Sequence, residues 1–315
     1  MRRHHGYRGL APADRGAAVA IGNFDGVHRG HQAVLALARA EAAALGAPFG
    51  VVTFEPHPRA FFNPDGPPFR LTGPEARARR LEALGVEQLY ELPFDAAMAA
   101  LPAETFVRDV LHAALGVRAL VAGADFHFGR GRGGNLELLR RMGPELGFAV
   151  VAAPLLDAGG DEVSSTAIRA ALEAGRPEEA ARLLGGWHRV EGVVEHGDAR
   201  GRLLGFPTAN LSLDGLHRPR SGVYAALVDV LDGPHRGRWP AAVNVGDRPT
   251  FGGGKVNLEA YLLDFDGDLY GATISVALVA WLRPELRFDG PEPLVARMRR
   301  DVAEARERLA ATLAY

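Results

Sequence analysis

The sequence predicts an α/β domain built on a parallel sheet, followed by a small antiparallel β-barrel and a final helix. In the first part of the 315 residues, short apolar runs alternate with helical patterns. From Trp187 onward, short β-rich runs are separated by turns rich in Gly, Pro and Asp. Domains usually hold about 100–200 residues, so this chain is expected to form two. Alternating strands and helices favour a parallel sheet, and closely spaced short strands favour a barrel.

In the first part, five apolar runs are expected to be strands and the segments between them helices. The expected strands are residues 19–21, 49–54, 88–92, 118–122 and 148–152. The expected helices are residues 31–45, 74–84, 104–115 and 136–142, which end before Gly46, Gly85, Gly116 and Gly143. Glycine after a helical pattern is a good stop because it adopts the left-handed conformation without strain.

A pair of glycines, Gly185 and Gly186, is interpreted as the linker between the domains. Two expected helices precede it, at residues 165–174 and 177–184. We therefore predict domains at residues 1–184 and 187–315. The strands expected after the linker are residues 188–195, 222–230, 241–245, 259–265 and 273–282. Residues 291–313 predict an amphipathic helix, with one apolar stripe made by Leu294, Met298, Val302, Ala305 and Leu309.

Composition excludes several classes of function. The net charge of -2, without basic clusters, gives no electrostatic field that would attract nucleic acid. The absence of cysteine excludes disulfides, thiol catalysis and thiolate metal sites, and it favours a cytoplasmic protein. No apolar run reaches the roughly 20 residues that span a bilayer, so no membrane segment is expected. The basic start at Arg2 and Arg3 is not followed by an apolar core, so it does not predict a signal peptide.

The most informative motif lies where the first expected strand meets the first expected helix. His28 and His31 stand three residues apart there with Gly30 between them, and they follow Gly22, Asn23, Phe24 and Asp25. Residues i and i+3 share one face of a helix, and a helix N-terminus offers free N–H groups and a partial positive charge. We interpret the motif as a site for the phosphates of a nucleotide triphosphate. Zinc is the alternative, but it would need a third and a fourth ligand.

A second candidate anion site begins at Ser164, before the expected helix that carries Thr166 and Arg169. A serine or threonine at this place is a routine N-cap, which is the purely structural alternative. Arg169 adds a cation beside the hydroxyls and the free N–H groups. Asp125 follows another expected strand, and ligands of parallel sheets bind beyond the carboxyl ends of the strands.

The barrel half contains a glycine-bearing loop and a lone carboxylate. Gly201 and Gly205 flank a loop whose backbone donors could meet phosphate. Thr208 and Asn210 follow it, point to the same side of an extended segment and offer the oxygen ligands that Mg²⁺ prefers. Glu259 interrupts an apolar strand pattern and is either an exposed side chain or a general base.

Taken together, these stretches resemble the bacterial bifunctional riboflavin kinase/FAD synthetase (FMN adenylyltransferase) family over nearly the whole chain. The residues that carry the resemblance are 22–31, 53–58, 123–129, 164–169, 201–210, 222–224, 244–250 and 259–271. The histidine element alone is shared by many nucleotidyltransferases. The element Pro207-Thr208-Ala209-Asn210, together with the residues around Arg248 and Tyr270, is far more specific.

The resemblance implies a Rossmann-like nucleotidyltransferase domain and a β-barrel flavokinase domain with a C-terminal helix. It also implies two reactions, in which ATP phosphorylates riboflavin to FMN and then adenylylates FMN to FAD with release of pyrophosphate. His28 and His31 would hold the ATP phosphates, and Arg169 with Ser164 would close on the pyrophosphate. Asp125 would shape the flavin side, Thr208 and Asn210 would carry Mg²⁺, and Glu259 would be the kinase base. A monomer or weak homo-oligomer is expected, with no nucleic acid or membrane partner.

Two other functions remain open at this stage. One is a nucleotidyltransferase for another substrate, such as pantetheine phosphate, joined to an unrelated barrel. The other is a flavin-binding sensor that has lost turnover. Thr208, Asn210 and Glu259 argue against the first, and the intact set of candidate catalytic residues argues against the second.

Overall fold

The computed structural model describes residues 1–154, 163–197, 201, 204–248 and 255–313. The chain divides into two compact units, each described here by itself. The first unit is Met1–Pro67 with Pro74–Val163, and the second is Pro68–Gly73 with Ser164–Tyr315. The predicted domain limits, 1–184 and 187–315, stay a prediction.

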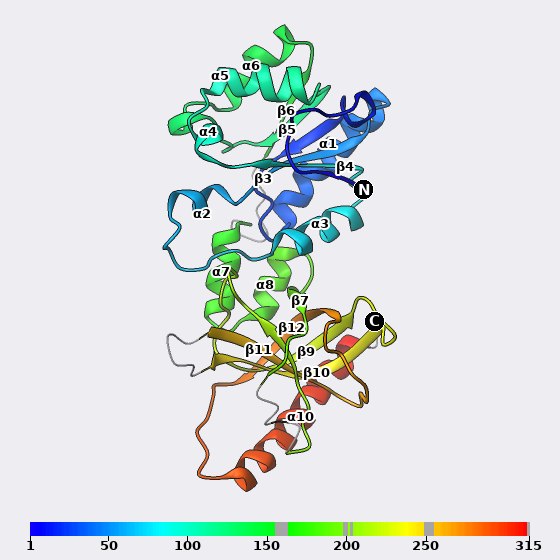
Figure 1. Cartoon of the computed structure of the whole chain (residues 1–315), viewed down its shortest axis with the longest axis vertical. Coiled ribbons are helices and arrows are strands. Elements are labelled where there is room, and N and C mark those ends of the chain that lie inside the picture. The colour runs from blue at the N-terminus through cyan, green and yellow to red at the C-terminus, as the bar shows by residue number, and fades with distance from the viewer. Residues whose placement is uncertain (155–162, 198–200, 202–203, 249–254, 314–315) are drawn as a thin grey trace. The chain divides into compact units, whose positions relative to one another are not determined.

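The first unit is built on a six-stranded parallel sheet with the order β1-β4-β3-β2-β5-β6 (Figure 1). The strands are β1 Arg2–His4, β2 Ala18–Ile21, β3 Phe49–Glu55, β4 Gln88–Pro93, β5 Ala119–Gly123 and β6 Ala149–Ala153. Every neighbouring pair is parallel, as the alternating pattern predicts. The edge strand β1 was not expected, and it pairs with β4 from the extreme N-terminus.

Helices cover both faces of this sheet, which is why its central strands are almost wholly apolar. The helices are α1 Arg29–Leu45, α2 Pro58–Phe62, α3 Pro74–Ala83, α4 Ala96–Ala99, α5 Ala103–Thr105 and α6 Leu136–Glu145, with a π-helix at Phe106–Ala114. One apolar core packs α1 and α3 against the sheet. The other packs the π-helix and α6 against the opposite face. All four residues of β2 are buried between the two cores.

Two expected helices of this unit are present but differ in detail from the expectation. The helix expected at residues 136–142 continues past Gly143 to Glu145. Gly143 does not stop it, because this glycine serves close packing: an added Cβ would lie 2.6 Å from Cγ2 of Val150. The helix expected at residues 104–115 is mostly π-helical, a difference that apolar spacing does not reveal.

The second unit is an antiparallel six-stranded barrel with the order β7-β12-β9-β10-β11-β8. Its strands are β7 His188–Val193, β8 Ala209–Ser212, β9 Gly222–Val230, β10 Gly237–Arg248, β11 Lys255–Leu262 and β12 Thr273–Arg283. Its helices are α7 Ser165–Glu173, α8 Pro177–Leu184 and α10 Pro291–Leu313. An antiparallel bridge between Glu195 and Asn210 joins the two ends of the sheet and nearly closes it. The predicted fold class, an α/β unit followed by a barrel and a C-terminal helix, is confirmed.

The strand expected at residues 259–265 was misplaced. It begins earlier, at Lys255, and ends at Leu262, and Asp264 then takes a left-handed conformation at φ 58°. The short strand β8 was expected only as an extended loop segment.

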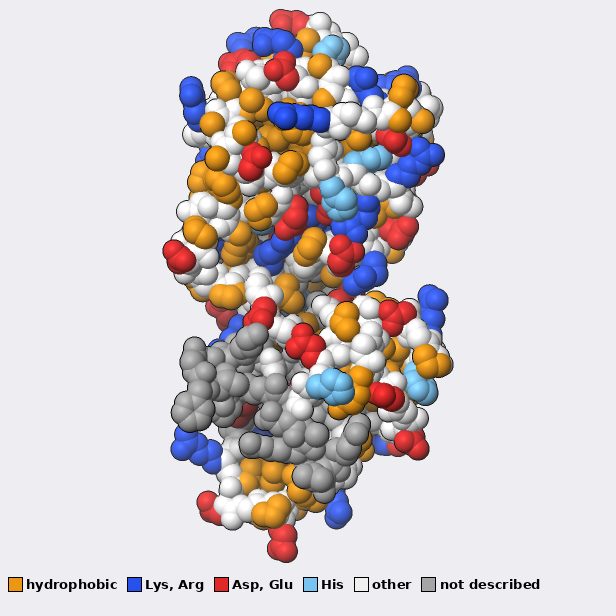
Figure 2. All heavy atoms as spheres, in the orientation of Figure 1, with side chains coloured by type: hydrophobic (Ala, Val, Ile, Leu, Met, Phe, Trp, Pro, Cys, Tyr) orange, Lys and Arg blue, Asp and Glu red, His pale blue; other side chains and the backbone are white. Residues whose placement is uncertain are grey.

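The C-terminal helix α10 lies along β9 and β10 on the outside of the barrel (Figure 1). Among the described residues, none of the helices combines the length and apolarity that a membrane span requires. On the face shown in Figure 2, acidic and basic side chains are interspersed over the described parts of both units.

Candidate active sites

The histidine pair of the first unit lies at the start of α1, at the carboxyl end of β2. His28 is the N-cap, and its Nδ1 accepts a hydrogen bond from the backbone N–H of His31 at 3.3 Å. The two imidazole rings stack with their centroids 3.6 Å apart. Because Nδ1 of His28 accepts, the ring proton belongs on Nε2, which makes Nε2 a donor suited to an anionic ligand.

His31 is held in its neutral form. Burial lowers its pKa well below the usual 6.5, and the nearby His28 and Arg80 lower it further. Its Nδ1 is buried and makes no hydrogen bond to the described residues. A bound polyanion would favour the charged ring, so this site can respond electrostatically to phosphate.

The loop before His28 has a fixed backbone. Phe24 and Val27 have positive φ values of 52° and 43°, which are uncommon for side chains of this size. Phe24 is 1% exposed, so its ring is locked in the core. The carbonyl of Asn23 accepts from Oγ1 of Thr53 at 3.2 Å and from Nη1 of Arg77 at 3.4 Å. Such strained conformations persist only where the surroundings impose them, so the loop is formed before any ligand arrives.

Gly30 has a steric role within the motif. A Cβ at this position would lie 3.2 Å from the ring of His28 and 3.3 Å from the carbonyl of Val163. A side chain at this position would press against the ring of His28, so the stacked arrangement of the two histidines favours glycine here.

Arg77 is a functional candidate that the sequence analysis missed. It lies on α3, is 1% exposed and reaches Oε2 of Glu55 and Oε1 of Glu91, each at 3.0 Å. Glu91 also pairs with Arg3 at 2.9 Å. Arginine in a helical pattern is normally assigned to solvent, so no sequence signal marked this residue.

Asp125 is exposed and follows β5, the strand next to β2. From β2 the chain adds β3 and β4 on one side of the sheet and then crosses back to place β5 on the other side of β2, so a topological switch point lies between β2 and β5. Ligands of open parallel sheets bind at such points. The structure thus brings the His28 loop and the Asp125 loop to neighbouring positions on one edge. The rings of Phe126 and Phe128 stack nearby at 5.6 Å.

Ser164 and Arg169 belong to the second unit. Oγ of Ser164 accepts from the backbone N–H of Ala167 at 3.2 Å and caps α7, as the structural alternative predicted. Nε of Arg169 donates to the carbonyl of Phe69 at 2.6 Å, and its guanidinium lies 5.5 Å from the Phe69 ring centroid. Thr166 is exposed.

Strand register aligns the candidate kinase residues in a single row across the barrel. Glu259 on β11 stands directly opposite Asn210 on β8 and opposite Asn244 on β10. The row continues to Val223 on β9 and Arg283 on β12. Directly paired residues share one face of a sheet, and this row lies on the outer face. Thr208, two residues before Asn210 on an extended segment, joins the same side.

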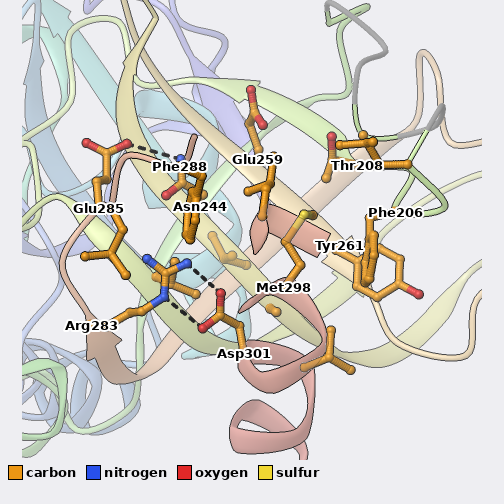
Figure 3. A pocket seen from close by; sticks show the side chains of 18 of the residues that line it. Phe206, Thr208, Asn244, Glu259, Tyr261, Arg283, Glu285, Phe288, Met298 and Asp301 are labelled. Carbon is orange, nitrogen blue, oxygen red and sulfur yellow. Dashed lines mark hydrogen bonds and ion pairs between the residues drawn. The ribbon is translucent and has the colours of Figure 1, made fainter. Parts of the chain in front are cut away.

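A cavity of about 630 Å³ lies between the barrel and α10, and Asn244, Glu259 and Arg283 of this row line it, whereas Asn210 does not. Figure 3 shows Glu259 between Asn244 and Thr208, with Phe206 and Tyr261 beside Thr208. The apolar side chains that line it are Leu204, Phe206, Val223, Ala242, Tyr261, Leu286, Phe288, Leu294, Met298 and Val302. This volume and this mixture of many apolar with few polar groups are typical of small-molecule sites.

The glycines of the barrel loop allow close approach around Asn210. A Cβ at Gly197 would lie 2.5 Å from Nδ2 of Asn210, and a Cβ at Gly201 would collide with the carbonyl of Phe206. Nδ2 of Asn210 donates to the carbonyl of Thr208 at 3.2 Å. Gly205 has φ 83°, which a side chain would strain. These glycines are therefore needed for the shape of the loop.

Four polar residues of the cavity were missed from the sequence: Asn244, Arg283, Glu285 and Asp301. Asn244 belongs to a stretch that carries the family resemblance, so a signal existed. Arg283, Glu285 and Asp301 lie outside those stretches, and only the tertiary structure brings them to the cavity.

Comparison with known proteins agrees with this division. The FAD synthetase family matches residues 10–167, and the riboflavin kinase family matches residues 184–309. A bifunctional riboflavin kinase/FMN adenylyltransferase from Pseudomonas fluorescens is 44% identical and covers 97% of both chains. The enzyme of that name from Bacillus subtilis is 35% identical and covers 92% of this chain and 91% of its own.

A solved structure from Streptococcus pneumoniae, described as a macrolide-efflux protein, superimposes with a TM-score of 0.82. It is 32% identical and covers 97% of this chain and 98% of its own. We use this likeness for the fold, because the two family matches and the curated relatives agree on a different activity.

Proposed function

The chain belongs to the family of bifunctional riboflavin kinase/FMN adenylyltransferases, and we propose that its two activities use the two sites described above. The row of Asn210, Glu259 and Asn244 across the barrel carries the kinase assignment. The stacked pair of His28 and His31 carries the adenylyltransferase assignment. ATP is the co-substrate of both reactions.

In the kinase reaction, the terminal ribityl hydroxyl of riboflavin attacks the γ-phosphorus of ATP. The flat, largely apolar flavin ring suits the apolar lining of the cavity, and the ribityl chain would then reach Glu259. Glu259 would accept the hydroxyl proton as the oxygen–phosphorus bond forms, because a neutral hydroxyl is a poor nucleophile. ADP leaves with the electrons of the broken bond.

The residues beside Glu259 fit a Mg²⁺ ion that arrives with the nucleotide. The described residues hold no cluster of three or more His, Cys, Asp or Glu side chains that could bind a metal by themselves. Thr208 and Asn210 instead offer two neutral oxygens, and Mg²⁺ commonly takes few protein ligands alongside substrate phosphates. When bound, Mg²⁺ neutralises charge on the transferring phosphoryl group. We propose Thr208 and Asn210 as its protein ligands.

In the adenylyltransferase reaction, the FMN phosphate attacks the α-phosphorus of ATP and pyrophosphate leaves. This nucleophile is already an anion, so no strong base is required. Nε2–H of His28 would donate to the ATP phosphates, and His31 would add charge as the polyanion raises its pKa. The backbone of Gly22, Asn23, Phe24 and Asp25 would shape the nucleotide pocket.

The remaining roles follow from the positions of these residues in the fold. We propose Asp125 on the flavin side, because it follows β5 at the switch point. We propose that Ser164, Thr166 and Arg169 bind the pyrophosphate, because they lie at the start of α7. We propose that the loop with Gly201 and Gly205 binds the nucleotide of the kinase reaction. A cytoplasmic location and a monomer or weak homo-oligomer complete the proposal, the location supported by the absence of cysteine.

A product assay tests both assignments at once. Wild-type protein is given riboflavin, ATP and Mg²⁺, and FMN and FAD are separated by chromatography over time; FMN should appear first and FAD second. Glu259→Gln should form no FMN from riboflavin yet make FAD when FMN is supplied. Loss of both reactions in this variant, while its thermal unfolding stays cooperative, would contradict the two-site assignment. Absence of either product from folded wild-type protein would favour a flavin-binding sensor.

A further inference from the structure

A bidentate ion pair ties α10 to the barrel at the wall of the cavity. Nε of Arg283, at the end of β12, donates to Oδ1 of Asp301 at 2.8 Å, and its Nη2 donates to Oδ2 at 2.6 Å (Figure 3). The two side chains are only 12% and 5% exposed. Arg297 also donates to Asp301 at 2.8 Å, and Glu304 balances the charge of Arg297 at 3.1 Å. Two parallel hydrogen bonds fix orientation as well as distance.

This ion pair lies where α10 changes its relation to the barrel. Beyond it, Ala305 and Leu309 are fully buried in a core with Ala225 and Leu227 of β9. Before it, the apolar side chains of Leu294 and Met298 are partly exposed and line the cavity instead of packing on the strands, and Val302, directly after Asp301, also lines it. The C-terminal half of the helix is therefore held by apolar packing, whereas the N-terminal half spans a hollow.

Because the apolar side chains of the N-terminal half face the cavity, apolar packing on the strands holds this half less than it holds the C-terminal half. Packing fixes the C-terminal half of α10, and the ion pair fixes the helix at Asp301. The direction of this ion pair therefore sets where the N-terminal half lies. A buried ion pair adds little stability compared with apolar residues of similar size, but its geometry is directional. The ion pair is therefore better suited to fixing the position of α10 than to stabilising the fold.

We propose that Arg283 and Asp301 are positioning residues of the riboflavin site, which hold the N-terminal half of α10 at the height that fits the flavin ring. This inference rests on the proposed kinase site. Neither residue takes part in the chemical step, which belongs to Glu259 at the other end of the cavity. Their loss should weaken riboflavin binding and leave the transfer step intact once the substrate is bound.

The experiment compares two ion pairs on the same helix. Asp301→Asn removes the cavity pair. Asp264→Asn is the matched control, since it removes an exposed pair in which Arg306 of α10 contacts Asp264 at 2.8 Å, away from the cavity lining. We expect Asp301→Asn to raise the KM for riboflavin about tenfold with kcat within about twofold, and Asp264→Asn to change neither. Equal KM values in the two variants, or a fall in kcat alone, would overturn the inference.

A second variant separates positioning from folding. Asp301→Asn leaves the Arg283 charge poorly compensated, so the double variant Arg283→Met/Asp301→Leu removes both charges and keeps the bulk. We expect it to recover the thermal stability of the wild type while the KM for riboflavin stays raised. Recovery of both quantities would show that the ion pair is only a packing element and would overturn the inference.

The proposed function is tested separately in the same assay. If wild-type protein makes no FMN, the kinase site itself is wrong. If wild-type protein makes FMN but the Arg283 and Asp301 variants have the wild-type KM for riboflavin, only the positioning role is wrong. Cooperative thermal unfolding of each variant shows that its barrel is folded, and conversion of supplied FMN to FAD shows that the first unit is intact.

Discussion

The two units present their reactive groups on different kinds of support. In the first, His28 and His31 stand on a helix N-terminus at the edge of a parallel sheet, on a backbone that buried side chains hold rigid. In the second, Glu259 stands on the outer face of a barrel, under a helix that is packed along only part of its length. In the proposed assignment, ATP phosphates meet a preformed loop in the first unit, whereas riboflavin enters a covered cavity in the second.

The difference follows from the two nucleophiles. FMN brings an anionic phosphate, so the first unit needs donors to offset charge and no carboxylate base. Riboflavin brings a neutral hydroxyl on a long apolar molecule, so the second unit needs a base and a large cavity. Each substitution changes a residue of one unit, and the reaction assigned to the other unit should be unaffected.

The largest effect is expected at His28. His28→Ala should lower FMN adenylylation about 10²–10³-fold, because it removes a donor to the ATP phosphates. Riboflavin phosphorylation should continue, so FMN should accumulate in the chromatographic assay. Retained adenylylation would contradict the role of His28 in binding phosphate. Equal loss of both reactions would contradict their assignment to two separate sites.

Arg77 tests whether the rigid loop matters. Arg77→Met should lower the free energy of unfolding by about 3 kcal/mol, because it leaves Glu91 with less compensation in a buried site. It should also raise the KM for ATP in adenylylation, since Asn23 loses a contact, while Arg77→Lys should do both to a smaller extent. Urea unfolding and initial rates measure these effects.

The control for Arg77 is Arg79→Met, which changes an exposed residue on the same helix. If Arg79→Met and Arg77→Met behave alike, the buried cluster has no special role in the nucleotide site.

Asn210 tests the metal assignment in the second unit. Asn210→Ala should raise the Mg²⁺ concentration for half-maximal riboflavin phosphorylation by about tenfold or more, because one of two proposed oxygen ligands is lost. A Mg²⁺ titration at saturating ATP measures this shift. Adenylylation of supplied FMN, titrated in parallel, should be unaffected; an unchanged kinase titration would remove Asn210 from the metal site.

The smallest effect is a pH dependence from His31. Because its pKa is lowered in the folded state, the unfolded chain takes up a proton below pH 6.5 that the folded chain does not. The free energy of unfolding should therefore fall below about pH 6.5, by up to about 1.4 kcal/mol per pH unit from this residue. Urea unfolding between pH 7.5 and 5.5 should show a steeper loss for wild type than for His31→Asn. Parallel slopes would mean that His31 is not buried in its neutral form.

Local patterns were enough for most elements and for the residues with distinctive chemistry. Strands such as β3 and helices such as α1 follow from apolar runs and closing glycines, because these signals act within a few residues. His28, Thr208 and Glu259 were found because their types and spacing point to phosphate, metal and base chemistry. The continuation of α6 through Gly143 was missed, because its cause is packing against Val150.

The sequence by itself therefore determined the order of the two folds and named the chemically distinctive residues. Only the tertiary structure decided how they meet, because strand register and burial depend on contacts between residues far apart in the chain. Register placed Asn244 and Asn210 on either side of Glu259. Folding buried Arg77 between two carboxylates, and it paired Arg283 with Asp301 in the wall of the cavity. In the sequence, Arg77, Arg283 and Asp301 look like ordinary surface residues, and only long-range packing gives them buried partners.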